Sequence, residues 1–140
     1  MFTTERLTLR AFRDDDIDKI THMRNNVDVQ RNVSTRAIVP LGPQNAQTVR
    51  KYVLDATVFV IITLKETGEF IGTSKLATKD PKNRDGSFGI CILPEFWGKG
   101  YGTEVTRFMV AYGFRWLGLH RVSLTVVQGN KRAISIYEKV

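Results

Sequence analysis

The sequence predicts an α+β fold with a mixed, mostly antiparallel central sheet flanked by helices. The predicted segments follow one another in the order β-α-α-β-β-β-α-β-α, which combines a run of strands with helices before and after it. Thr67 and Gly68 are turn-forming residues between two strand-like segments, which predicts an antiparallel hairpin. The strand–helix–strand run over residues 87–127 predicts one parallel pair. The 140 residues suit a single domain, 1–140.

The first third of the chain predicts one strand and two helices. Apolar and polar residues alternate over residues 5–12, as in a half-buried strand. Three aspartates at 14–16 precede apolar residues at helical spacing up to Met23, and acids favour the start of a helix. Proline and glycine at residues 40–43 indicate a loop, and a second helix is expected over residues 43–54.

The rest of the chain predicts four strands and two helices. β-Branched and apolar residues are dense in the expected strands, and the polar run at 79–86 indicates a turn. In the longer helix, apolar residues from Val105 to Trp116 recur at helical spacing and are expected to face the core. The expected strands cover residues 57–64, 69–77, 87–93 and 121–127, and the expected helices cover residues 103–117 and 130–139.

The chain is basic, with 21 lysines and arginines against 14 acids and a net charge of +7. This balance is compatible with nucleic acid, an anionic surface or a phosphate-rich cofactor as partner, and it does not choose among them. Because the basic residues are spread along the chain without a long tract, a solvated basic surface is the simpler interpretation. Nucleic acid is therefore a disfavoured partner.

The sequence gives no signal for secretion or for a membrane span. It contains no run of about 18 apolar residues, and its first ten residues lack the apolar core of a signal peptide. The single cysteine, Cys91, excludes an internal disulfide and agrees with a reducing compartment. We therefore expect a cytoplasmic protein without a membrane partner. His22 and His120 are isolated, which predicts no metal site.

A glycine-rich turn, PEFWGKGYGTE over residues 94–104, separates the expected strand 87–93 from the long helix. Glycine permits positive φ and close approach of the backbone to a ligand, and a helix start offers free amides to phosphate. Lys99 adds a positive charge there. The GxGxG spacing excludes a dinucleotide fingerprint, and the absence of Ser or Thr after Gly98-Lys99 excludes a P-loop. Taken alone, a tight packing turn is an equally good interpretation.

A second group of residues follows the expected strand 121–127. Asn130 and Tyr137 are seven positions apart, which places them on one face of the last helix. The carboxyl ends of two parallel strands lie at the same edge of a sheet, which is the usual ligand position in such units. The glycine-rich turn and Asn130 are therefore expected to meet at one site.

The segments WGKGYGTE and VVQGNKRAISIYEKV together resemble the acyl-CoA-binding blocks of the GNAT superfamily of acetyltransferases. The segments ERLTLRAFRDDDIDKI and ILPEFWGKGYGTE are similar to its RimJ/RimL branch of ribosomal-protein N-terminal acetyltransferases, which neighbours the spermidine acetyltransferases. The resemblance covers nearly the whole chain and implies a GNAT-like fold. It implies an N-acetyltransferase that uses acetyl-CoA as co-substrate, without a metal, and transfers acetyl directly to a primary amine. The acceptor is either a protein N-terminal α-amine or a small amine such as a polyamine.

The resemblance also implies roles for particular residues. Backbone groups at 90–92 would pair with the pantetheine arm like an added strand, and amides at 98–103 would hold the pyrophosphate. Asn130 would hydrogen-bond the arm, and Tyr137, as the catalytic acid, would protonate the departing thiolate. Trp97 stands where the family has Gln or Arg, and it either covers the cofactor or packs under the turn. The implied cofactor-binding residues are Ile90, Cys91, Ile92, Trp97, Gly98, Lys99, Gly100, Tyr101, Gly102, Thr103, Asn130 and Ala133.

The residues leave the general base open. Many relatives carry Glu near the position of Ser87, which cannot ionise usefully. Asp85 lies two residues earlier on the same strand face. Two alternatives for removal of the amine proton therefore stay open: Asp85 accepts it through water, or the acceptor arrives already neutral. Cys91 is expected to be a small buried hydrophobe rather than a catalytic thiol. The acids expected near the acceptor lie at residues 14–16 and Asp28.

The family pattern usually continues beyond Val140 with Gly-Phe and a further strand. Without that terminal strand we expect strand 121–127 to expose an edge, unless a partner chain supplies the strand, as in a homodimer. Lower stability than in relatives, or self-association, is therefore predicted. The alternative functions are a catalytically impaired acyl-CoA-binding module and, less favoured, a basic nucleic-acid-binding domain.

Overall fold

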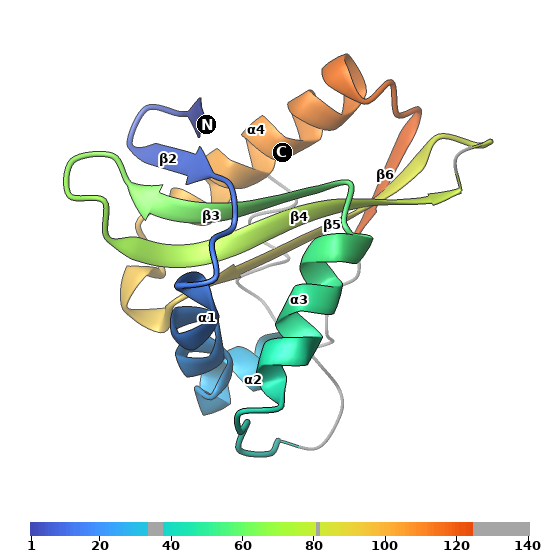
Figure 1. Cartoon of the computed structure of the whole chain (residues 1–140). Coiled ribbons are helices and arrows are strands. Elements are labelled where there is room, and N and C mark those ends of the chain that lie inside the picture. Colours follow the sequence, from blue (N-terminus) through green and yellow to red (C-terminus); the bar gives the residue numbers. More distant parts are fainter. Residues whose placement is uncertain (34–37, 81, 125–140) are drawn as a thin grey trace.

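The computed structural model describes residues 1–33, 38–80 and 82–124, and its described strands form one sheet. The strands are β1 (Phe2–Thr3), β2 (Leu7–Arg10), β3 (Val58–Leu64), β4 (Phe70–Asp80), β5 (Asp85–Ile92) and β6 (Arg121–Leu124). They lie side by side in chain order (Figure 1). Neighbours are antiparallel except β5 and β6, which are parallel. The mixed, mostly antiparallel sheet and its single parallel pair are therefore confirmed.

Helices cover both faces of this sheet. Three helices lie on one face and α4 lies on the other (Figure 1). A short 3₁₀ turn over Pro94–Phe96 leads from β5 into α4. The helices on the first face are α1 (Asp16–Arg24), α2 (Val27–Val33) and α3 (Asn45–Asp55), and α4 covers Tyr101–Trp116.

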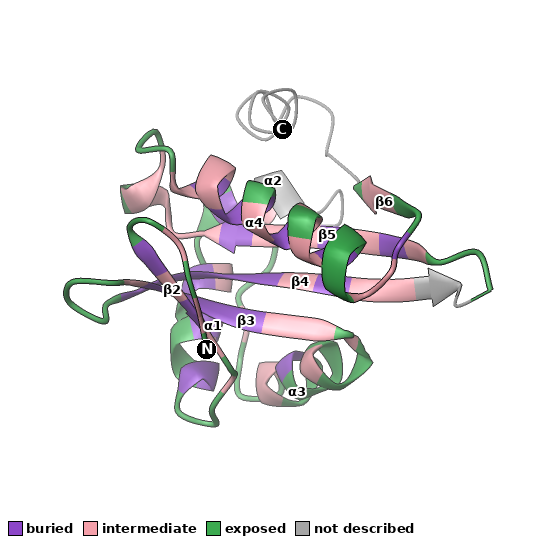
Figure 2. Cartoon of the chain, turned by 90° about the horizontal axis from the view of Figure 1, so that it is seen from above, coloured by how far each residue is buried: buried purple, intermediate pink, exposed green. Residues whose placement is uncertain are grey.

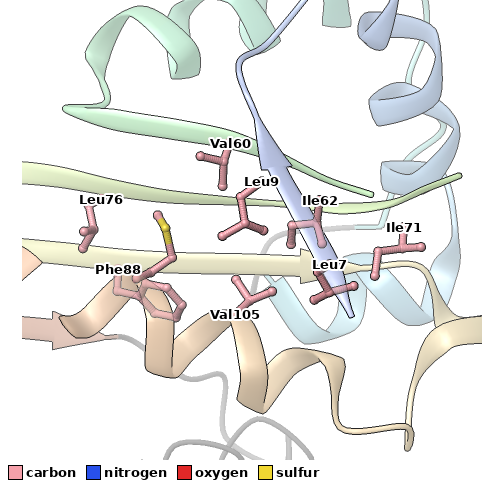
Figure 3. Close-up of a cluster of buried hydrophobic side chains, with 9 residues drawn as sticks. Leu7, Leu9, Val60, Ile62, Ile71, Leu76, Phe88 and Val105 are labelled. Carbon is pink, nitrogen blue, oxygen red and sulfur yellow. The ribbon is translucent and has the colours of Figure 1, made fainter. Parts of the chain in front are cut away.

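Each face of the sheet carries its own hydrophobic cluster, because side chains alternate along a strand. Ile61 belongs to one cluster and its neighbour Ile62 to the other. The buried residues follow the middle of the sheet, between the helix layers (Figure 2). The α4 side holds Leu7, Leu9, Val60, Ile62, Ile71, Leu76, Phe88, Val105 and Met109 (Figure 3). The α1–α3 side holds Ile17, Ile20, Met23, Val29, Val49, Ile61, Phe70 and Cys91.

A buried ion pair joins β2 to α1. Asp16, which is 1% exposed, accepts hydrogen bonds from Arg10 Nη1 at 2.9 Å and Nη2 at 2.7 Å. The backbone amide of Arg13 donates to the same carboxylate at 2.8 Å. Burial by itself raises the pKa of Asp16, but the bonds from Arg10 and Arg13 outweigh it and lower the pKa. The carboxylate therefore stays ionised and fixes the start of α1 against the sheet.

Some elements differ from the sequence prediction. The turn predicted over residues 79–86 is shorter, because β4 extends to Asp80 and pairs with Asp85 at the start of β5. The prediction that Trp116 faces the core is wrong, since this side chain is 71% exposed. The buried side of α4 instead passes through Gly113, where an added Cβ would lie 3.1 Å from Leu119 Cδ1. The strand β1 and the helix α2 were not predicted.

Candidate functional site

The glycine-rich turn leaves backbone amides free at the start of α4. Gly98 and Gly100 have φ angles of 76° and 85°, in the left-handed region that suits glycine. The first hydrogen bond of the helix runs from the Glu104 amide to the Gly100 carbonyl at 3.1 Å. Amides before Glu104 in the first turn have no intrahelical acceptor, and no side chain of the described residues caps the helix. The predicted conformation of the turn is thus present, with donors suited to an anion.

Residues 89–92 of β5 lie next to this turn and, within the described residues, have a partner strand on one side. The parallel pairing with β6 spans Asp85 to Phe88, so within the described chain residues 89–92 pair only with β4. Gly72 lies on β4, and a Cβ added to it would lie 2.2 Å from the carbonyl oxygen of Cys91. The Cys91 carbonyl therefore faces β4. Alternation along the strand directs the polar groups of Ile90 and Ile92 to the opposite edge. An extended ligand can lie along that edge from the glycine-rich turn.

Trp97 packs under the turn. Its indole Nε1 donates to the Ile92 carbonyl at 2.8 Å, and its ring packs against the α1–α3 cluster. This bond satisfies the last carbonyl of β5 and fixes the start of the turn. Lys99 lies with its Nζ 5.6 Å from the centre of the Phe96 ring. Trp97 thus packs under the turn, and its contact with the cofactor stays a prediction.

A side-chain network that the sequence analysis did not anticipate holds the turn from the other side. Arg6, just before β2, donates from Nε to Glu104 Oε1 at 2.9 Å and from Nη1 to the Lys99 carbonyl at 2.8 Å. Its guanidinium also lies 4.4 Å from the centre of the Tyr101 ring. Thr4 donates its hydroxyl to Glu104 Oε2. The N-terminal segment and the first turn of α4 are thus tied together.

A hollow of about 460 Å³ lies between the end of α1 and the segment after β5. The two asparagines on its α1 side make hydrogen bonds within the protein. Asn25 bonds the backbone of Leu41, and Asn26 Oδ1 accepts from the Asp28 amide. Glu95 provides the carboxylate in its lining, which consists of His22, Asn25, Asn26, Leu93, Pro94 and Glu95.

A second hollow, of about 580 Å³, lies away from the turn. It lies along the second half of α4, and its lining is mostly aromatic. The lining residues are Phe2, Thr3, Phe108, Tyr112 and Trp116.

The structure places the other predicted site residues as follows. Asp85 begins β5 and shares a face with Ser87. At about 3.3 Å per residue, Asp85 lies roughly 23 Å from Ile92, the end of β5 that is next to the glycine-rich turn. Cys91 is buried, and burial raises the pKa of its thiol, in line with a packing role. Residues 125–140 lie outside the described residues, and with them Asn130, Ala133 and Tyr137.

Fold and site together define an α+β protein with backbone amides suited to an anion at the carboxyl end of β5. The chain matches the model of the acetyltransferase (GNAT) domain over residues 6–140. It is 31% identical over 137 residues to the uncharacterized N-acetyltransferase p20 of Bacillus licheniformis, with 95% of this chain and 76% of that protein covered. It is 29% identical over 140 residues to spermidine N(1)-acetyltransferase of Escherichia coli K12, covering 94% and 70%. Spermidine N-acetyltransferase from Vibrio cholerae, solved with CoA and spermine, superposes with a TM-score of 0.82 at 25% identity, covering 97% and 80%.

The chain therefore belongs to the GNAT acetyltransferase family. It is an N-acetyltransferase that uses acetyl-CoA. Membership of the RimJ/RimL branch stays a prediction. Among the described residues, no helix is long and apolar enough to cross a membrane. The same part of the chain contains no group of three or more His, Cys, Asp or Glu side chains arranged for a metal ion.

Proposed function

We propose that this chain transfers acetyl from acetyl-CoA to a small primary amine, with the cofactor pyrophosphate on the glycine-rich turn and its pantetheine arm along β5. The observation that carries the proposal is the position of the turn, with amides at residues 101–103 that have no intrahelical acceptor, next to residues 89–92 of β5, which within the described residues pair only with β4. Acetyl-CoA supplies an activated acetyl group as a thioester. The amides of the turn and Lys99 supply hydrogen bonds and positive charge to the phosphates.

The residues of β5 contribute orientation and charge stabilisation. Holding both reactants on one strand edge removes much of the entropic cost of bringing them together. The amide of Ile90 is the candidate donor to the carbonyl oxygen of the thioester as negative charge develops there. Tyr137 remains the candidate acid for the departing thiolate, since a phenol is well matched to that proton transfer.

Lys75 supports the alternative in which the acceptor amine loses its proton without a dedicated base. Its Cγ and Cε lie 3.5 Å from the position that a Cβ of Gly89 would occupy in β5. Burial lowers the pKa of Lys75, and the charge of Arg24 lowers it further. The same burial disfavours the ammonium form of an amine that enters beside β5. The Nζ of Lys75 itself lies over the Tyr52 ring, 4.4 Å from its centre. Asp85, at the far end of β5, accepts the proton only through a chain of waters.

The acceptor is proposed to enter the hollow that contains Glu95. The spermidine acetyltransferases among the relatives, and the bound spermine in the Vibrio cholerae structure, favour a small polyamine over a protein N-terminus. Glu95 offers a carboxylate to a second ammonium group of such a substrate. Asp16, expected among the acids near the acceptor, is buried and paired with Arg10, so it does not serve this purpose.

Calorimetric titration with acetyl-CoA tests the placement of the cofactor. Gly100→Glu puts a carboxylate on the turn and should abolish binding. Gly68→Glu is the matched control, because Gly68 also has positive φ, at 75°, and lies between β3 and β4 with open space around it. Wild type and the Gly68 variant should bind alike. Equal binding by both variants would contradict the proposed site.

An acceptor screen with spermidine and with a peptide bearing a free N-terminus then tests the substrate class. Turnover of spermidine supports the small-amine assignment. Turnover of the peptide alone would replace it by the protein N-terminal acceptor. Cofactor binding without turnover on any amine would favour the impaired acyl-CoA-binding module.

A further inference from the structure

We propose that Arg6 and Glu104 are positioning residues that hold the phosphate-binding turn in its binding conformation before the cofactor arrives. The inference rests on the proposed placement of the pyrophosphate at the glycine-rich turn. Neither residue is offered as a direct contact of the cofactor. Both act through the backbone of residues 98–103.

Arg6 fixes the middle of the turn. Lys99 stands between the two positive-φ glycines, and its carbonyl accepts from Arg6 Nη1 at 2.8 Å. This bond directs the carbonyl toward the protein, so its oxygen does not face the bound phosphates. The guanidinium also stacks on Tyr101, and Nη2 lies 3.1 Å from the position of a Cβ on Gly100. One side chain thus contacts Lys99 and Tyr101 and lies beside Gly100 between them.

Glu104 in turn holds Arg6. Its carboxylate accepts from the Arg6 amide and from Nε, each at 2.9 Å, and from the Thr4 hydroxyl. Burial by itself raises the pKa of Glu104, but the bonds from Thr4 and Arg6 outweigh it and lower the pKa. The carboxylate is therefore charged at neutral pH. A charge-assisted pair of this geometry orients the guanidinium toward the turn.

The charge of Glu104 also needs a partner for the site to work. An acid in the first turn of a helix stabilises the helix, but here it would repel an anionic ligand at the same helix end. Arg6 is that partner, and its planar guanidinium serves Glu104, the Lys99 carbonyl and the Tyr101 ring at once. Lysine has no such fork, so it cannot make these three contacts together.

The test compares a ligand that has the pyrophosphate with one that lacks it. Dissociation constants for CoA and for pantetheine are measured by calorimetry on wild type, Arg6→Gln, Arg6→Lys and Glu104→Gln. Loss of the preorganised turn should weaken CoA binding by about tenfold in Arg6→Gln and leave pantetheine binding unchanged. Arg6→Lys should recover only part of the loss. Arg50→Gln removes the same charge from the exposed surface of α3 and should bind CoA like wild type.

The outcomes separate this inference from the proposed function. A wild-type chain that binds CoA no better than pantetheine would mean that the turn is not the phosphate site. A wild-type preference for CoA that Arg6→Gln leaves intact would overturn the positioning role alone, and so would equal weakening of both ligands. The direction of the change in CoA affinity of Glu104→Gln separates two explanations. If Glu104 only repels the ligand, the variant should bind CoA more tightly, whereas the positioning role predicts weaker binding. If Arg6→Gln fails to fold, Arg6→Lys and Glu104→Gln carry the test.

Discussion

Replacing Gly72 by alanine should force β4 and β5 apart at the strand that lines the proposed cofactor site. The added Cβ would lie 2.2 Å from the Cys91 carbonyl oxygen and 3.0 Å from Ile92 Cα, whereas ordinary contacts begin at 3.4 Å. Both neighbours are backbone, so no side-chain rotation relieves the overlap. Overpacking of this kind costs about 1–3 kcal/mol. A chain of this length has a total stability of about 7–20 kcal/mol, so the change is substantial.

Thermal unfolding monitored by circular dichroism measures this cost. The midpoint for Gly72→Ala should fall by roughly 5–10 °C. Gly89→Ala is the matched control, because its Cβ would meet only Lys75 side-chain atoms at 3.5 Å. Alanine in a strand interior is favoured over glycine by about 0.5–1 kcal/mol, so this control should melt at or above the wild-type temperature. Equal midpoints for the Gly72 variant and wild type would refute the close approach of β4 to β5.

Two further predictions concern the buried ion pair at the start of α1. Arg10→Met leaves the Asp16 carboxylate buried without its partner and should cost about 3–5 kcal/mol in urea unfolding; a loss below about 1 kcal/mol would mean that the pair behaves like an exposed one. Because the folded-state pKa of Asp16 lies below its ordinary value of 3.8, its contribution is complete above that pH and is lost as pH falls through the folded pKa. Asp16→Asn should therefore be less stable than wild type at pH 7, with a gap that closes in acid. A gap that stays constant from neutral to strongly acidic pH would contradict this.

Hydrophobic periodicity predicted most of the fold, and it failed where an element depends on distant contacts. Leu7 and Leu9 are buried as the alternation of residues 5–12 predicted. The strand β1 has only two residues and exists because Phe2 pairs with Leu9 and packs on Phe108 and Tyr112 of α4. No local pattern encodes such contacts. The helix α2 is polar apart from a few valines, so its sequence carries no clear periodic signal.

The candidate site was predictable only as far as it is local in sequence. The spacing of Gly98 and Gly100 indicated the turn, and the structure confirms their positive φ angles. The contact between Arg6 and Glu104 joins residues 98 positions apart, which one sequence cannot reveal. The single local hint was an acid in the first turn of a helix, and helix stability alone explains it. The bond from Trp97 to the Ile92 carbonyl likewise became visible only in the structure.

The long sequence separation of Arg6 and Glu104 has a consequence for synthesis of the protein. Thr4 and Arg6 leave the ribosome nearly 100 residues before the helix start that they bind. At about 5–20 residues per second, the N-terminal segment waits roughly 5–20 s for its partner. The antiparallel strands β2 to β5 are neighbours both in the chain and in the sheet, so all four are synthesised during that interval. Full affinity for CoA therefore appears only after the start of α4 has been made, so tight CoA binding can report that the two distant segments have joined.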